Sequence, residues 1–414
     1  MADTPNIRFK GFTEPWEQRK LGEICSRVQG NDGRMNLPTL TISAANGWMK
    51  QEDRFSGNIA GKEQKNYTLL HKGELSYNHG NSKLAKYGTV FSLQTYEEAL
   101  VPRVYHSFKV KIGNADFIEY YFATKIPDWE LRKLISSGAR MDGLLNIGYD
   151  DFMGIKMMFP PTPEQNKIAE YFRRLDHLIT LHQRKCDETK ELKKYMLQKM
   201  FPKKGEQNPE IRFEGFTEPW EQRKLGDICE RVTRKNKNNQ SDLPLTISSQ
   251  YGLIDQRNFF NKVVAAKDMS DYYLLQNGEY AYNKSYSNGY DYGSIKRLNA
   301  YEQGCLSTLY ICFSLEALDV DSDYLECFFD TLQWYSDVSM ICAEGARNHG
   351  LLNVDTKAFF TDVRISLPIS IKEQRLIAKY LNNLDNLITL HQRKCDKLKE
   401  MKKYMLQNMF PKKG

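Results

Sequence analysis

The sequence predicts an α+β fold in which two tandem globular segments are each followed by a long helix, and the two helices pack as an antiparallel coiled coil. The first observation is a stretch, Glu164–Gly205, that returns almost unchanged as Glu373–Gly414. The second is an opening stretch, Pro5–Val28, that returns as Pro209–Val232. The third is a series of short strand patterns with glycine turns inside each half. The chain is therefore a tandem duplication, since a period of about 200 residues is far longer than that of a solenoid repeat.

Composition and charge narrow the class of protein. A chain of 414 residues is too long for one ordinary core, so at least two domains are expected. The net charge of +7 weakly favours polyanionic partners. No run approaches the roughly 18 apolar residues of a membrane span, and the first residues lack the apolar core of a signal peptide. The eight cysteines include no CxxC pair and no zinc-type spacing, so we expect reduced thiols, a cytoplasmic location and no bound metal.

Prolines and a polar linker set the predicted boundaries. Pro160–Pro163 and Pro368 interrupt the chain before each long helix, and Lys203–Asn208 is a polar, glycine-containing linker. The predicted segments are a first globular domain at 1–163, a first helix at 164–202, a linker at 203–208, a second globular domain at 209–372 and a second helix at 373–411.

Each globular domain contains strand and helix patterns at matching places. Leu69–Asn78 and Leu274–Asn283 each predict a short strand pair with a glycine turn. Helices are expected near Asp116–Leu134 and Asp321–Ile341, so each domain mixes short strands with helices.

The long helices carry apolar residues at heptad spacing. From its Glu-Gln start to its Met-Phe end, each would hold about 37 residues and extend about 55 Å. Positions seven apart form two rows that predict a coiled-coil seam with a polar middle. The first row is Ile168, Leu175, His182, Thr189 and Met196 with Ile377, Leu384, His391, Leu398 and Met405, and the second is Tyr171, Leu178, Lys185 and Leu192 with Tyr380, Leu387, Lys394 and Met401. A third row, Phe172, Ile179, Cys186 and Met200 with Leu381, Ile388, Cys395 and Met409, makes the apolar face wider than a two-stranded coiled coil needs. This face is expected to pack against the chain's own domains or to bind partner helices. The residues predicted to form helix or partner interfaces are Ile168, Leu175, Leu178, Ile179, His182, Leu192, Ile377, Leu384, Leu387, Ile388, His391 and Leu398.

Catalytic motifs are missing from the sequence. Gly57–Lys62 resembles a phosphate loop but is one residue short and is followed by Glu63, so a surface turn is expected. No GxGxxG, HExxH or GxSxG motif is present. The acidic pair Asp150-Asp151 is expected to be solvated, although a nuclease site built from separated acids and a lysine stays an alternative.

Taken in their order along the chain, these features resemble the DNA-specificity subunit of type I restriction-modification systems. The resemblance covers almost the whole chain and rests on the doubled plan and on three motifs that each occur twice. The first motif is a Trp-x3-Lys-Leu-Gly-x-Ile opening, at Trp16–Ile24 and Trp220–Ile228. The second is a Gly-Leu-Leu-Asn segment, at Gly143–Asn146 and Gly350–Asn353. The third is a proline before the EQxxIA helix start, at Pro160/Glu164 and Pro368/Glu373.

The resemblance implies two target-recognition domains, each reading one half of a split, asymmetric sequence in double-stranded DNA. It implies two modification subunits, which bind S-adenosylmethionine and methylate adenine, and it leaves restriction subunits, which use ATP and Mg²⁺, as optional partners. The chain itself would bind no cofactor and catalyse nothing. Two alternatives stay open, namely a single-chain DNA-modifying enzyme and a coiled-coil scaffold that binds proteins.

For DNA contact, the informative feature is a pair of equal-length loops that differ inside a shared frame. The frames Tyr77-Asn78 to Tyr87-Gly88 and Tyr282-Asn283 to Tyr292-Gly293 enclose residues that can hydrogen-bond bases or phosphates. An ordinary polar turn is the alternative. Arg140 and Arg347, in a shared Gly-Ala-Arg, suit phosphate binding or a structural ion pair. The predicted DNA-binding residues are Tyr77, Asn78, Asn81, Ser82, Lys83, Lys86, Tyr87, Arg140, Tyr282, Asn283, Lys284, Ser285, Asn288 and Arg347.

Overall fold

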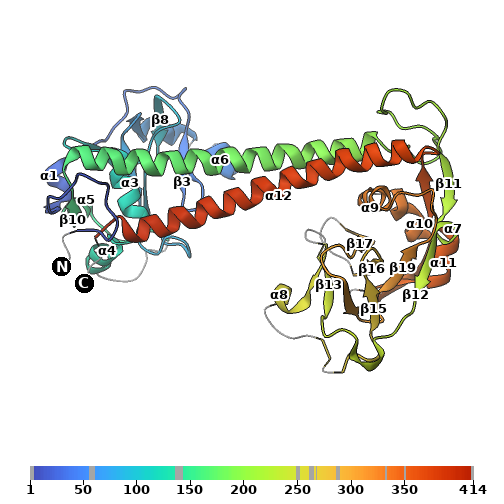
Figure 1. Ribbon diagram of the computed structural model, residues 1–414. Helices are drawn as coiled ribbons and strands as arrows, with labels where there is room; N and C mark the ends of the chain where they lie inside the picture. Colours follow the sequence, from blue (N-terminus) through green and yellow to red (C-terminus); the bar gives the residue numbers. More distant parts are fainter. Residues whose placement is uncertain are drawn as a thin grey trace. The chain divides into compact units, whose positions relative to one another are not determined.

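The chain folds into two compact units. The computed structural model describes residues 4–55, 61–135, 143–248, 252–260, 265–266, 268–285, 290–331, 333–348 and 351–411. Unit 1 is formed by Met1–Gln183 together with Gln392–Gly414, and unit 2 by Arg184–His391. Each unit therefore contains one globular domain and a part of each long helix, and both chain termini lie at unit 1 (Figure 1).

The long helices are α6, Thr162–Lys199, and α12, Ile371–Asn408, with 38 residues each. Each begins after a proline-containing turn, and Pro202 and Pro411 follow their ends, where proline cannot continue the helical hydrogen-bond ladder. In unit 1 the first part of α6 and the last part of α12 lie side by side and run in opposite directions (Figure 1), and the Cys395 thiol donates to the Ile179 carbonyl at 3.9 Å. In unit 2 the Cys186 thiol donates to the Ile388 carbonyl at 3.8 Å. The predicted antiparallel helix pair is confirmed.

A four-stranded antiparallel sheet forms the centre of each globular domain. In unit 1 its order is β2 (Cys25–Arg27), β9 (His106–Val110), β6 (Leu75–Asn78) and β7 (Thr89–Ser92). In unit 2 it is β12 (Cys229–Val232), β19 (Ile311–Leu315), β16 (Tyr280–Asn283) and β17 (Ser294–Arg297). The same strand order in both units agrees with the duplication.

Two-stranded antiparallel sheets surround the central ones. In unit 1 they are β1 (Glu17–Lys20) with β10 (Lys156–Phe159), β3 (Leu40–Ser43) with β4 (Gly47–Lys50), and β5 (Thr68–His71) with β8 (Glu98–Val101). In unit 2 they are β11 (Glu221–Lys224) with β22 (Arg364–Leu367), β13 (Leu245–Ser248) with β14 (Gly252–Asp255), β15 (Tyr273–Gln276) with β18 (Gln303–Leu306), and β20 (Cys342–Asn348) with β21 (Leu351–Val354).

Short helices connect these strands. Unit 1 has α1 (Leu21–Ile24), α2 (Gln51–Phe55), η1 (Gly61–Asn66), α3 (Ala115–Ala123), α4 (Asp128–Leu134) and α5 (Tyr149–Met153). Unit 2 has α7 (Leu225–Ile228), η2 (Lys237–Asn239), α8 (Gln256–Phe260), α9 (Ser322–Asp330), α10 (Gln333–Ile341) and α11 (Thr356–Asp362). The mixture confirms the predicted α+β class.

The predicted strand pairing inside Leu69–Asn78 is wrong, and so is that inside Leu274–Asn283, where β15 pairs with β18 and β16 pairs with β17 and β19. Strands β5 and β6 both form, and Gly73 turns the chain between them with a φ of 86°. However, β5 pairs with β8 whereas β6 pairs with β7 and β9. The glycine turn is thus a corner between two sheets, a distinction that local strand propensity does not contain.

The core of each domain is completed by the end of a long helix from the other half of the chain. In unit 1 the Phe410 ring, after α12, lies 5.6 Å from that of Phe117 and 6.1 Å from that of Trp16, between ring centroids. In unit 2 the Phe201 ring, after α6, lies 6.0 Å from Trp220 and 5.7 Å from Tyr324. Neither half of the sequence can therefore close its own core.

Burial along the helices revises the predicted seam. The third row is buried, since Phe172, Cys186, Leu381 and Cys395 have 0% exposure. The second row faces outward, with Leu178 39%, Leu192 44% and Leu387 44% exposed. Of the first row, Ile168, Leu175, Ile377 and Leu384 are buried, while His182, His391 and Leu398 are partly buried, as are Ile179 and Ile388 of the third row. The seam is thus formed by the first and third rows, and the placement of Leu178, Leu192 and Leu387 in it is wrong.

Equivalent ion pairs join the two helices in both units. Lys402 contacts Asp176 at 2.5 Å in unit 1, and Lys193 contacts Asp385 at 2.8 Å in unit 2. In unit 2 the Lys193 ammonium also contacts Asp330 at 2.7 Å, and Lys296 contacts the same carboxylate at 2.7 Å. Such paired charges favour this register of the two helices, because a shifted register would separate them.

Candidate nucleic-acid interface

Each predicted DNA-contacting loop is closed by a buried tyrosine and a glycine. In unit 1 the Tyr77 hydroxyl donates to the Tyr87 carbonyl at 2.7 Å, and the Tyr77 ring stacks on Phe152 at 4.3 Å. Gly88 has a φ of 80°, and a Cβ there would lie 2.5 Å from the Asn78 carbonyl oxygen. Only glycine fits at such a position, because it allows positive φ and close backbone approach.

Unit 2 repeats this closure. The Tyr282 hydroxyl donates to the Tyr292 carbonyl at 2.6 Å, and the Tyr282 ring stacks on Phe359 at 5.0 Å. Gly293 also has a φ of 80°, and a Cβ there would lie 2.1 Å from the Asn283 carbonyl oxygen. The two loops therefore leave and re-enter the same rigid frame.

This closure corrects the roles predicted for two tyrosines. Tyr77 and Tyr282 each have 0% exposure, and burial raises the pKa of both phenols. A fully buried ring that packs in the core cannot contact DNA from the folded state. Both residues position the loops instead.

The tip of the unit 1 loop is open to solvent. Asn81, Ser82, Lys83 and Lys86 are exposed, and Leu84 is 66% exposed. Tyr87 is partly buried under Lys86, whose ammonium lies 5.7 Å from the ring centroid. The loop thus presents amide, hydroxyl and ammonium groups to solvent.

The start of each loop is held by the Gly-Leu-Leu-Asn segment. In unit 1 the Leu145 N–H donates to the His79 carbonyl at 2.8 Å, and the Asn81 N–H donates to the Gly143 carbonyl at 3.0 Å. In unit 2 the Leu352 N–H donates to the Lys284 carbonyl at 2.9 Å. Two motifs that lie far apart in the sequence therefore meet at the loop.

Side chains at the start of each loop also form hydrogen bonds that hold its backbone in place. His79 is buried, and its ring nitrogens lie 2.7 Å and 2.9 Å from the Leu145 and Val104 carbonyl oxygens. Asn78 and Asn283 each accept a hydrogen bond at 3.0 Å from the backbone N–H two residues on, at Gly80 and Ser285. Lys284 is partly buried, and burial together with the nearby Arg231 charge lowers its pKa.

Some predicted positions have no described geometry. Arg140, Asn288 and most of Gly57–Lys62 lie outside the described residues. Arg347 belongs to strand β20, opposite Leu352, but its side chain lies outside the described part. The acidic pair Asp150-Asp151 is exposed in α5, as expected.

A groove of 620 Å³ borders the loop of unit 1, and sequence reasoning missed it. Asn78, Gly80 and Asn81 form part of its lining, together with Arg54 and Arg103 from other segments. The signal that could have found these arginines is their difference from the uncharged residues at the aligned positions of the second half.

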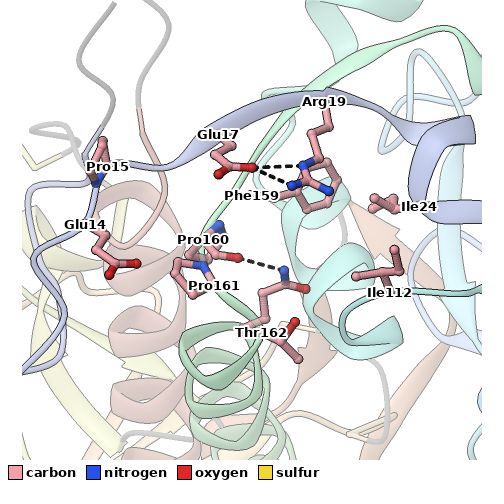
Figure 2. A pocket seen from close by; sticks show the side chains of 11 residues that line it. Glu14, Pro15, Glu17, Arg19, Ile24, Ile112, Phe159, Pro160, Pro161 and Thr162 are labelled. Carbon is pink, nitrogen blue, oxygen red and sulfur yellow. Dashed lines mark hydrogen bonds and ion pairs between the residues drawn. The ribbon is translucent and has the colours of Figure 1, made fainter.

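A second pocket has one wall of residues that both halves share. Its volume is 420 Å³, and Figure 2 shows Glu17 and Arg19 facing the Pro160–Thr162 turn, with Ile24 and Ile112 to one side. Arg19 donates to Glu17 at 2.6 Å, and the Gln165 side chain donates to the Pro160 carbonyl at 2.8 Å. Thr13–Gly22, which supplies one wall, is identical in sequence to Thr217–Gly226, although most of its side chains are exposed. Surface residues that stay identical while the rest of the two halves has diverged indicate a function that both halves share.

The described part of the chain contains neither a candidate metal site nor a candidate membrane-spanning helix. No group of three or more His, Cys, Asp or Glu side chains that could hold a metal ion occurs there. No described helix is both long enough and apolar enough to cross a membrane. All eight cysteines are free thiols.

Comparison with known proteins agrees with this geometry. A family model described as type I restriction modification DNA specificity domain matches residues 13–191 and 217–400. The S subunit of a type I restriction-modification system from M. genitalium has a similar structure, with 14% sequence identity and a TM-score of 0.62 over 99% of this chain and 100% of that chain. The HsdS subunit from Thermoanaerobacter tengcongensis matches over 99% of both chains, with 15% identity and a TM-score of 0.42. No curated protein sequence matches the chain.

Proposed function

Because this chain belongs to the family of type I restriction-modification DNA specificity subunits, we propose that each unit reads one half of a bipartite, asymmetric target in double-stranded DNA. The observation that carries the proposal is the pair of loops on one frame. Closure by Tyr77 and Gly88 in unit 1 and by Tyr282 and Gly293 in unit 2 is the same, whereas the residues between them differ. A constant frame with variable tips gives two readers of unequal sequence.

The remaining predicted residues keep their proposed roles in this scheme. Asn81, Ser82, Lys83 and Lys86 offer groups that hydrogen-bond base edges or phosphates, and they are exposed. Arg140 and Arg347, which are shared by both halves, are proposed to bind phosphates. Asn288 is proposed to contact DNA in the second half-site, next to the position of Lys284 and Ser285.

The partners are also part of the proposal. In this family partner subunits carry out methylation, so we propose that two modification subunits with S-adenosylmethionine bind this chain in the cytoplasm. Restriction subunits with ATP and Mg²⁺ are optional additions. A partner present in two copies needs the same surface twice, and the second helix row supplies it. Leu178 of unit 1 and Leu387 of unit 2 occupy equivalent exposed positions, as do Tyr195 and Tyr404.

An exchange of loop tips tests the reading of DNA. We expect that exchanging Asn81–Leu84 with residues 286–289, which have the same length, changes the methylated motif while the fold is kept. Ala85 is excluded from the exchange because it is 2% exposed, and His79 because its ring is bonded in the frame. Base contacts contribute about 1–3 kcal/mol each, whereas phosphate contacts affect all sequences alike.

The measurement is sequencing of methylated adenines in cells that hold the exchanged chain and its partners, with circular dichroism as the fold control. Binding to random duplex and its salt dependence should stay at the parental level. A folded, exchanged chain that directs methylation of the parental motif at the parental rate would refute the loop assignment. Methylation by the purified chain alone would favour a single-chain enzyme instead.

A second experiment tests the partner surface. We expect Leu178→Glu with Leu387→Glu to weaken association with the modification subunits at least tenfold, because burying a leucine contributes about 1.5–3 kcal/mol. Thermal stability of the isolated chain should change little, since both side chains are exposed. The matched control is Leu318→Glu, at a 97% exposed position that does not belong to either long helix. Unchanged association by sedimentation would remove this surface from the proposal.

A further inference from the structure

The groove beside the unit 1 loop combines a floor that both units share with a wall that differs. Thr41 and Tyr105 belong to the floor, where their side-chain oxygens lie 3.0 Å apart. The equivalent Thr246 and Tyr310 oxygens lie 3.4 Å apart in unit 2. The equivalence follows from the paired strands, since β3 and β13 carry the threonines while β9 and β19 begin one residue after the tyrosines.

The floor also contains an unsatisfied acceptor in each unit. Gln51, the first residue of α2, is 2% exposed, and its Nε2 donates to the Tyr67 hydroxyl at 3.2 Å. Its Oε1 is buried and has no hydrogen-bond partner among the described residues, and the same holds for Oε1 of Gln256, the first residue of α8. Their backbone N–H groups donate to equivalent carbonyls, those of Thr39 and Pro244. A buried acceptor without a donor costs free energy, and its presence at matching places shows that the floor is built alike in both units.

The side chains of the wall differ from the aligned residues of unit 2. Arg54 and Arg103 line the unit 1 groove, and both are exposed. Phe259 and Thr308 occupy the aligned positions of α8 and of the loop between β18 and β19. Arg54 donates from Nη1 to the Ile42 carbonyl at 2.7 Å, which holds the guanidinium against the sheet. A fixed guanidinium beside an open groove is suited to a planar acceptor pair.

The side chains of this wall are suited to particular DNA bases. The guanine O6 and N7 atoms form an acceptor pair in the major groove that arginine binds in a bidentate manner. A phenylalanine ring and a threonine methyl group instead suit the thymine methyl. We propose, on the basis of the function proposed above, that the groove is a base-reading site of unit 1 and that Arg54 and Arg103 read guanine in the half-site of this unit.

Replacing Arg54 and Arg103 by the aligned residues of unit 2 tests this inference. In the complete chain with its modification subunits, we expect Arg54→Phe with Arg103→Thr to lower the preference for the cognate unit 1 half-site about 10–100-fold over variants that lack its guanine. The other half-site should keep its motif. The measurements are competition binding with single-base variants and mapping of methylated adenines.

Arg132→Thr is the matched control, because Arg132 is an exposed arginine of α4 in the same unit and lies outside the groove lining. An equal loss of affinity for every duplex, with a smaller salt slope, would mean that the two arginines bind phosphates, and it would overturn the inference. An unchanged motif in a folded Arg54→Phe, Arg103→Thr chain would overturn it too. If the wild-type complex itself shows no sequence preference, the proposed function fails rather than the groove assignment.

Discussion

Residues 1–205 alone should form a homodimer. Unit 1 needs Met409 and Phe410 from the end of the chain to complete its core, where they are 1% exposed. An isolated first half lacks them, but it ends in the same Met-Phe-Pro-Lys-Lys-Gly sequence at Met200–Gly205. A second copy can therefore place its Met200 and Phe201 where Met409 and Phe410 lie. A dimer of identical units would prefer a symmetric target built from one half-site.

Sedimentation at tens of micromolar should show the dimer. Phe201→Asp should abolish it and leave an unstable chain, because a charged side chain replaces a buried ring. Leu192→Asp is the control, since that side chain is 44% exposed and the dimer should persist. A folded monomer of residues 1–205 would contradict the view that each core is completed from the other half.

The second large effect is a loss of stability, which is expected when Asp330 is replaced. Its carboxylate contacts Lys193 and Lys296, each at 2.7 Å, and the Asp330 side chain is 17% exposed. Asp330→Asn would leave two largely buried ammonium groups without their shared partner. We expect unit 2 to lose about 3–5 kcal/mol of unfolding free energy, the range observed when one member of a buried ion pair is removed. Urea unfolding followed by circular dichroism measures this loss.

The loss should depend on pH. Burial alone would raise the Asp330 pKa, but the charges of Lys296 and Lys193 outweigh it and hold the pKa below its ordinary value. A carboxylate whose pKa is lowered by folding stabilises the fold above its unfolded pKa, and this contribution disappears as pH falls. The difference between wild type and Asp330→Asn should therefore shrink below about pH 4.

Asp323→Asn is a matched control from the same helix, α9. Asp323 pairs with Arg297 but is 52% exposed, so its removal should cost no more than about 1 kcal/mol. Equal losses for the two variants would show that the Asp330 cluster adds nothing beyond a surface ion pair.

Local sequence determined the parts of this protein that depend on neighbouring residues. The heptad spacing and the flanking prolines predicted two long helices, and the structure has them at Thr162–Lys199 and Ile371–Asn408. Internal similarity predicted the duplication, and the order of the repeated motifs predicted the family. The shared Tyr-Asn and Tyr-Gly pairs pointed to a common loop frame, because a conformation that needs glycine at one position leaves a trace in both halves.

Tertiary structure alone decided which side chains face inward and which residues meet. Three apolar rows on one helix are wider than a coiled-coil seam, so the packing of the domains selected Phe172 and Cys186 for burial and left Leu178 exposed. Tyr77 lies inside because β6 is a central strand, which a single loop sequence cannot reveal. Arg54 and Arg103 border one groove only after α2 and the β8–β9 connection come together. Periodicity specifies which residues share a face of an element, whereas the partner of that face follows from contacts between segments distant in the chain.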